Sequence, residues 1–227
     1  MQRVRLRFRR GEPLKYLGHL DLFRLWERAF RRSGLPLAYS AGYSPHPRLA
    51  MAAPLPVGVT SECELMDVVL ERPVAPPTLI IQSLNRALPP GLEIIDAWDV
   101  APQLPSLQSL VRFAEYQVVA CWSDHSPAGP QAAIAGLLGA ESVPWQQRRD
   151  KGQRHYDLRP LVDAIWVEGQ QEGRWALGMR LRHDNQGAGR AEQVTAALGF
   201  PEPPLSIHRR QLILETPSPD RGQGGHV

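Results

Sequence analysis

The sequence contains only two cysteines in 227 residues, Cys63 and Cys121, and they are not in CxxC spacing. A zinc site, a redox-active pair or an iron–sulfur cluster needs more or closer thiolates, so we expect no metal site and no cofactor in this chain. No apolar run approaches the roughly 18 residues of a membrane helix. The basic start MQRVRLRFRR is not followed by an apolar segment, so we expect no secretory signal, no membrane partner and a cytoplasmic location.

Lysine is also scarce, because only Lys15 and Lys151 are lysines among the 26 basic residues. The sequence lacks GxxxxGK[ST], GxGxxG after a strand, HExxH and GxSxG, and it therefore carries none of the common phosphate-loop, dinucleotide, zinc-protease or serine-hydrolase signatures. Charge is distributed unevenly. Residues 1–50 hold eleven basic and three acidic residues, whereas the remainder holds fifteen and twenty. A basic surface that contacts a partner is therefore expected in the N-terminal part.

The first hundred residues alternate between strand and helix patterns. Residues 3–9 alternate strictly between arginine and apolar side chains, which predicts a half-buried strand. Residues 19–32 have helical spacing and are followed by Gly34, a residue that commonly ends helices. The further elements expected are strands at 35–40, 49–53, 64–70 and 92–100, and a helix at 77–88. The two short strands at 35–40 and 49–53 flank a proline-broken region, and the overall order is βαββαβ, the ferredoxin-like pattern.

The second hundred residues repeat this order, with one more strand candidate than the pattern needs. The expected helices are at 130–138 and 191–198, and the expected strands at 114–122, 154–158, 163–169, 174–182 and 206–214. We therefore predict an α+β fold of two tandem ferredoxin-like units with antiparallel sheets. The predicted divisions are a basic N-terminal unit at 1–100, a linker at 101–110, a C-terminal unit at 111–215 and a disordered tail at 216–227.

Arginines are predicted to gather on two surfaces of the N-terminal unit. With both helices on one side of the sheet, the first strand presents Arg3, Arg5, Arg7 and Arg9 on the open side, and such a row repels itself unless water, carboxylates or an anionic ligand compensates. The first helix carries a stripe formed by Arg24, Arg28 and Arg31. Each set is either a solvated face or part of an electrostatic footprint for nucleic acid. The strand has no aromatic residue among its arginines, which disfavours a base-stacking platform on that strand.

The stretch AGYSPHPR at 41–48 is the most unusual loop of the sequence. Its two prolines restrict the backbone, so the loop can hold Tyr43, His46 and Arg48 in fixed positions at a low entropic cost on binding. His46 and His19, which starts the first helix, are the catalytic candidates, because a histidine near phosphate can act as a base in RNA cleavage. Structural roles for both histidines, and a loop that only packs against the sheet, are the alternatives.

A second basic cluster lies at 154–159, within the sequence RHYDLR. Asp157 and Arg159 are close enough in sequence to form a local ion pair that closes a turn before Pro160. Arg159 is alternatively part of a binding surface.

Several short segments together resemble a known bacterial family. They are KYLGHLD (15–21), ERA (27–29), RR (31–32), GLP (34–36), YSAGYSPHP (39–47), PLPVG (54–58) and YDLRP (156–160). The sequence resembles the radical-SAM-linked family of unknown function, whose domain is found fused to, or encoded beside, B12-type radical SAM proteins. The resemblance implies a radical SAM enzyme as the partner. The chain lacks the CxxxCxxC motif of such enzymes, so it is not expected to be the radical enzyme itself.

Three functions follow from these observations. The leading hypothesis is a non-catalytic accessory protein that binds RNA or presents substrate to a partner radical SAM enzyme. The alternatives are a metal-independent endoribonuclease that uses His19 or His46, and a purely protein-binding module. The residues expected to contact RNA or a partner are Arg3, Arg5, Arg7, Arg9, Lys15, Arg24, Arg28, Arg31, Tyr43, His46, Arg48 and Arg159.

Overall fold

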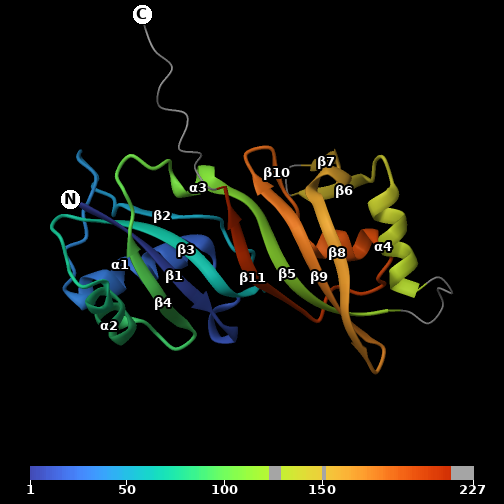
Figure 1. The fold of residues 1–227 in the computed structure, drawn as a ribbon, viewed down its shortest axis with the longest axis horizontal. Helices are drawn as coiled ribbons and strands as arrows, with labels where there is room; N and C mark the ends of the chain where they lie inside the picture. The colour runs from blue at the N-terminus through green and yellow to red at the C-terminus, as the bar shows by residue number, and fades with distance from the viewer. Residues whose placement is uncertain (123–128, 150–151, 216–227) are drawn as a thin grey trace, which may run out of the picture.

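The computed structural model describes residues 1–122, 129–149 and 152–215. The predicted disordered tail lies outside the described residues. Within them, five α-helices and a mostly antiparallel sheet form a mixed α+β fold (Figure 1). The helices are α1 (His19–Ser33), α2 (Pro77–Ala87), α3 (Leu107–Leu110), α4 (Gly129–Gly139) and α5 (Ala191–Ala197). The strands are β1 (Gln2–Arg10), β2 (Leu49–Met51), β3 (Thr60–Leu70), β4 (Leu92–Asp99), β5 (Val111–Cys121), β6 (Pro144–Arg149), β7 (Gly152–Asp157), β8 (Val162–Gln171), β9 (Arg174–Asp184), β10 (Gly187–Ala188) and β11 (Ser206–Leu214).

In the N-terminal half, the strands lie in the order β4-β1-β3-β2, and each neighbouring pair is antiparallel. The alternating sequence of β1 separates its two faces. Val4, Leu6 and Phe8 are buried in one cluster with residues of α1 and α2, and the Phe8 ring meets the Trp26 ring edge-on at 5.0 Å. Burial of each such side chain stabilises the fold by about 1.5 to 3 kcal/mol, so a register shift that exposed them is strongly disfavoured.

In the C-terminal half, the strands lie in the order β8-β9-β5-β11, again with antiparallel neighbours. Strand β5 alternates as β1 does, because Ala114, Tyr116 and Val118 are buried in a cluster that includes residues of α4 and α5. Strands β6 and β7 form a separate two-stranded sheet.

The two halves share one nine-stranded sheet, because β11 pairs with β3 in parallel. The paired residues Arg10, Ser61, Arg209 and Tyr116 form one row across four strands, on the side that the helices cover. Helices α1, α2, α4 and α5 therefore lie on the same side, and in Figure 1 α1 is behind the strands. We call the opposite side, to which the β1 arginines point, the open face.

The predicted elements agree with the observed ones to within a few residues, except for one predicted strand and for α3, β6 and β10, which were not predicted. The strand predicted at 35–40 forms only isolated bridges, Leu37 with Leu70 and Tyr39 with Pro47. Strand β6 was not predicted, because PWQQRR has no alternating apolar residues to mark it. Of the helices in the described ranges, none is long and apolar enough to cross a membrane.

Candidate nucleic-acid interface

The four arginines of β1 that point to the open face are paired with carboxylates on the neighbouring strands. Asp67 of β3 accepts hydrogen bonds from Arg3 Nη2 and Arg5 Nε, both at 2.7 Å, and all three side chains are largely buried. The other two pairs are Arg7–Asp96 at 3.5 Å and Arg9–Glu93 at 3.3 Å. Carboxylates therefore supply the compensation that this row of arginines requires, and β1 is not a bare cationic surface.

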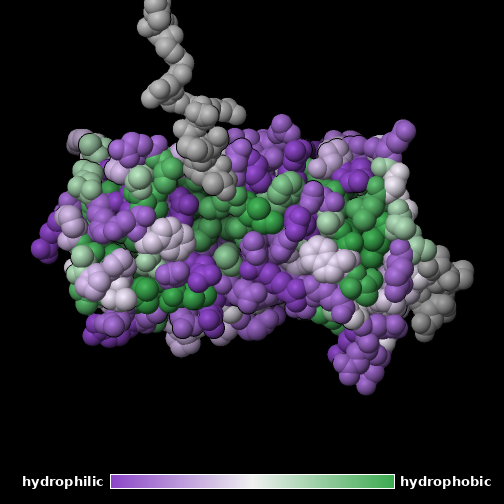
Figure 2. Space-filling model, in the orientation of Figure 1, coloured by the Kyte–Doolittle hydropathy of each residue, from purple (hydrophilic) through white to green (hydrophobic). Residues whose placement is uncertain are grey.

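The stripe on α1 is neutralised at two of its three positions. Arg24 pairs with Asp21 at 3.2 Å and Arg31 with Glu27 at 3.5 Å, whereas the exposed Arg28 has no carboxylate within 4.0 Å in the described chain. On the opposite, open face, Figure 2 shows hydrophilic and hydrophobic areas side by side. The charge asymmetry of the sequence is thus largely balanced when the chain folds.

A buried arginine orders the turn before α1. Arg10 donates hydrogen bonds to three carbonyl oxygens of this turn, those of Leu14 (2.9 Å), Lys15 (3.0 Å) and Leu17 (2.6 Å). Burial lowers the pKa of Arg10, although the Glu64 carboxylate opposes this effect. The Lys15 carbonyl also accepts from Gly58 N at 2.8 Å, while the Lys15 side chain pairs with Glu12 at 2.6 Å. These bonds bring KYLGHLD and PLPVG, which are distant in sequence, into contact.

The loop at 41–48 is closed at its base and exposed at its tip. Ser40 N donates to the His46 carbonyl at 2.9 Å, and His46 N donates to Ser40 Oγ at 3.0 Å. Gly42 has φ of 125°, a value that favours glycine. Tyr43 is fully exposed at the tip, so its ring is available to a partner.

The two candidate catalytic histidines, His19 and His46, lie at opposite ends of β1. Arg10 ends this strand and bonds to the turn before His19, whereas Arg48, two residues after His46, contacts the first residue of the chain. A strand of this length spans roughly 25 Å, so the two imidazoles do not form one acid–base pair.

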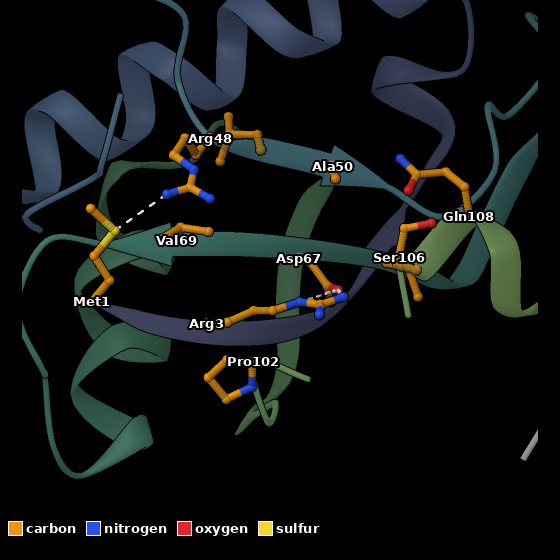
Figure 3. Close-up of a pocket in the computed structure, with 11 residues that line it drawn as sticks. Met1, Arg3, Arg48, Ala50, Asp67, Val69, Pro102, Ser106 and Gln108 are labelled. Atoms are coloured by element: carbon orange, nitrogen blue, oxygen red, sulfur yellow. Dashed lines mark hydrogen bonds and ion pairs between the residues drawn. The ribbon is translucent and has the colours of Figure 1, made fainter. Parts of the chain in front are cut away.

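A pocket of about 610 Å³ lies at the base of the 41–48 loop and brings together two predicted site residues, Arg3 and Arg48 (Figure 3). Its other lining residues are Met1, Leu49, Ala50, Asp67, Val69, Pro102, Ser106, Leu107 and Gln108. Arg3 already has Asp67 as its partner. In the described chain Arg48 has no carboxylate partner, and its Nη1 lies 3.3 Å from Met1 Sδ. The pocket therefore combines apolar walls with one cation that is free to bind an anion.

The segment predicted as a linker forms one wall of this pocket. Arg3 donates to the carbonyl oxygens of Leu104 (2.8 Å) and Pro105 (2.9 Å), which fixes the segment against β1. Leu107 and Leu110 of α3 are buried. This wall was not predicted from the sequence because proline, glutamine and serine dominate the segment. The available signal was the pair of leucines three residues apart, which is the spacing of one helical face.

The predicted ion pair between Asp157 and Arg159 is wrong. The Arg159 guanidinium donates instead to the carbonyl oxygens of Leu138 (2.8 Å) and Val162 (2.7 Å), where it holds α4 to the start of β8. Asp157 Oδ1 accepts from the backbone N of Val143 (2.8 Å) and of Arg159 (2.9 Å), and these two bonds lower the pKa of Asp157. YDLRP closes a turn as expected, but through backbone bonds.

Several solved structures partly resemble the chain at low sequence identity. A chain of a Cbf5-Nop10-Gar1 complex has 11% sequence identity and a TM-score of 0.48, with 93% of this chain and 48% of that chain covered. A chain of an H/ACA RNP bound to a substrate RNA containing 2'-deoxyuridine has 10% identity and a TM-score of 0.49, with 92% and 47% covered. The chain thus spans about half the length of these proteins.

Comparison of the sequence itself places the chain in a family. No curated protein matches it. A bacterial family, described as "Uncharacterized protein conserved in bacteria (DUF2344)", matches residues 3–190, which include the 41–48 loop, every pocket-lining residue except Met1, and every strand of the sheet except β11 and the first residue of β1. The chain therefore belongs to the DUF2344 family of conserved bacterial proteins.

Proposed function

We propose that this protein is a non-catalytic accessory protein that binds single-stranded RNA at the Arg48 pocket and presents it to a partner radical SAM enzyme. One observation carries the RNA part of the proposal. Arg48 has no carboxylate partner in the described chain, lies at the rim of an apolar-lined pocket, and shares a stiff loop with the fully exposed Tyr43. Proteins that bind single strands use cations for the phosphates and aromatic rings for the bases.

The placement of the histidines supports binding over catalysis. His19 and His46 are at opposite ends of β1, so neither serves as the partner acid or base of the other. The His19 ring packs against Phe23 at 4.9 Å, which is a structural contact.

The radical SAM partner is proposed because short segments in both halves of the chain resemble the radical-SAM-linked family. Purification of the tagged protein from native cells, followed by mass spectrometry, tests this partnership. We expect a radical SAM protein among the co-purified polypeptides, and its consistent absence would contradict the partnership while leaving RNA binding to be judged by itself.

Replacing Arg48 with glutamine should weaken RNA binding about tenfold at low salt. The substitution removes one phosphate contact, so the slope of log K against log salt should become shallower by about 0.7, the value for one phosphate of a single strand. The measurement is fluorescence anisotropy of a labelled oligouridylate of about 12 nucleotides at several salt concentrations.

Arg9→Gln is the matched control for this experiment. Arg9 is also an exposed arginine, but Glu93 already neutralises it, so its loss should change affinity and slope much less. Equal effects of the two substitutions would indicate a general response to net charge and contradict a site at Arg48. If the wild-type protein has no affinity for RNA at low salt, the RNA part is wrong and the loop is a protein-docking element.

We also propose that each half is a ferredoxin-like unit, with the division between units in residues 101–110. The strand orders β4-β1-β3-β2 and β8-β9-β5-β11 support this proposal, because both follow the same order of first, second, third and fourth strands. Each half also has a helix between its first two and its last two strands of this set.

A further inference from the structure

An indole ring lies on the open face of the C-terminal half. Trp166 of β8 is directly opposite Gly178 of β9 in the sheet register, and Gly178 itself is buried. The neighbours of Gly178 along the strand, Leu177 and Met179, point to the helix-covered core, so Gly178 and Trp166 are on the other side.

The ring of Trp166 lies flat on the sheet. A Cβ atom added to Gly178 would be 2.0 Å from Cε2 of the indole, and 2.3 Å from both Cζ2 and Nε1. Cζ2 and Nε1 are the atoms bonded to Cε2 on either side. A position beyond the ring edge in the ring plane would be nearer to one of these two atoms than to Cε2. Because both are farther than Cε2, the Cβ position lies above the ring plane. One face of the indole therefore covers the glycine backbone. Trp166 is 37% exposed, so part of the side chain away from the glycine contacts solvent.

Three polar side chains hold this ring in place. Glu168 Oε1 accepts a hydrogen bond from Trp166 Nε1 at 3.2 Å, and Glu168 Oε2 accepts one from Gln117 Nε2 at 3.0 Å. Arg210 of β11 pairs with the same carboxylate. The register of β8 and β9 shifts between Val167 and Gly169, and this bulge places Glu168 beside Trp166. The ring is thus oriented before any ligand arrives.

A hollow of about 450 Å³ lies one row further along the same face. Its floor is formed by small residues, Gly169 and Ala176, which are paired with each other across β8 and β9. The other lining residues are Val119, Gln170, Gln171, Glu172 and Arg174. Arg174 is exposed, and no carboxylate lies within 4.0 Å of it in the part of the chain that is described.

We propose that Trp166 is a stacking platform for an unpaired RNA base, that the hollow receives the next nucleotide, and that Arg174 contacts a phosphate. This inference rests on the proposed RNA-binding function and adds a second contact point to it. A flat aromatic face that is rigidly held, with amide and carboxylate groups at its edge and a cation two rows away, matches the way in which single-stranded RNA is recognised on sheet surfaces.

The charges favour a nucleotide over an acidic or basic peptide. Arg180 and Arg210 are already paired with Glu115 and Glu168, so the surface around the ring is close to neutral. A base brings no charge of its own, while its phosphate suits Arg174, which lines the hollow together with one carboxylate, Glu172. An aromatic or arginine side chain of a protein partner could also stack on the ring, and the experiment below separates that case.

The test combines a change in the protein with a change in the RNA. Wild-type protein, Trp166→Leu and Trp166→Phe are titrated with a labelled oligouridylate and with an oligonucleotide of the same length in which abasic sites replace the bases. We expect the wild-type protein to bind the oligouridylate at least tenfold more tightly than the abasic strand. Trp166→Leu should lose most of this preference, whereas Trp166→Phe, which keeps a ring, should retain most of it.

Two further variants test whether the position of the indole and the choice of tryptophan matter. Gly178→Ala keeps the indole but displaces it, because the new Cβ would occupy the ring position, so it should also lose the preference for bases. Trp98→Leu removes an equally exposed tryptophan of β4 and should leave the preference unchanged. Circular dichroism and urea unfolding establish that each variant is folded under the binding conditions.

The outcomes separate this inference from the proposed function. If the wild-type protein binds oligouridylate but Trp166→Leu keeps the same preference for bases, the platform is wrong and RNA binding stands. Equal losses in Trp166→Leu and Trp98→Leu would overturn the assignment to Trp166. If the wild-type protein binds neither strand, both proposals fail, and a peptide ligand becomes the explanation for the open ring.

Discussion

Replacing Glu64 with leucine should lower the free energy of unfolding by about 3 to 5 kcal/mol, because it leaves a buried guanidinium without its carboxylate. Arg209 is fully buried and Glu64 is 7% exposed. Arg209 Nε donates to Glu64 Oε1 at 2.8 Å, Nη2 bonds to Glu64 Oε2, and Nη2 also donates to the Ala53 carbonyl at 3.0 Å. Burial disfavours the charged form of Arg209, but Glu64 and Tyr116 together outweigh this effect and raise the pKa of Arg209.

The position of this ion pair makes it important for the whole fold. Strands β11 and β3 join the two halves of the sheet through only two residue pairs, Arg209 with Ser61 and His208 with Thr60. Two side-chain bonds support this short junction, Thr60 Oγ1 with His208 Nδ1 at 2.8 Å and Ser61 Oγ to the Arg209 carbonyl at 3.1 Å. The loss of Glu64 is therefore expected to weaken the contact between the halves as well as the ion pair.

Urea unfolding of four proteins measures this effect: wild type, Glu64→Leu, Arg209→Met and the double variant. Each single substitution leaves one charge of the pair without its partner, whereas the double variant removes both charges of the pair and fills their space with apolar atoms. The double variant should therefore recover most of the stability lost in Glu64→Leu. A loss below about 1 kcal/mol in Glu64→Leu, or strictly additive losses in the double variant, would show that the pair is not coupled as its geometry indicates.

Much of the fold was predictable because local periodicity decided it. The strict alternation of residues 3–9 and the helical spacing of residues 19–32 correspond to β1 and α1, since each pattern buries one face. The pairing of β3 with β11 was not predictable from such patterns. It depends on Arg209 and Glu64, which are 145 residues apart and look like ordinary surface charges in the sequence. Only the folded chain reveals that they share one buried site.

The candidate site was predictable only in part, because the contacts between its strands depend on a register that the sequence does not specify. The sequence identified Arg3 and Arg48, and the fold brings them into one pocket. The sequence-based prediction of an unpaired row of arginines on β1 was too high in charge. The carboxylates that pair with this row, Asp67, Asp96 and Glu93, come from neighbouring strands whose register the sequence does not specify. The Trp166 platform was missed for the same reason, since its flat ring requires a glycine directly opposite on another strand.

Below about pH 6.5 the protein should lose stability through one histidine, His183 of β9. Its Nδ1 is buried without a hydrogen-bond partner among the described residues. Burial, and to a smaller extent the charge of the nearby Arg209, lower the pKa of His183 to about 4, although Glu64 and Asp184 oppose the change. The unfolded chain, with an ordinary histidine pKa of about 6.5, therefore binds a proton that the folded chain excludes. The stabilisation is complete above about pH 6.5 and is lost as the pH falls toward 4.

This difference in pKa predicts a loss of about 2 kcal/mol between about pH 7.5 and pH 5, since one pKa unit corresponds to about 1.4 kcal/mol. Urea unfolding at both values measures it, and the comparison with His183→Leu isolates it from the carboxylates that also titrate. The leucine variant should lose about 2 kcal/mol less than the wild type over this range. His155→Gln, which changes an exposed histidine, should behave as the wild type does. An identical pH dependence in His183→Leu and the wild type would mean that the imidazole is solvated in the folded protein, and that the burial seen beside Arg209 does not persist in solution.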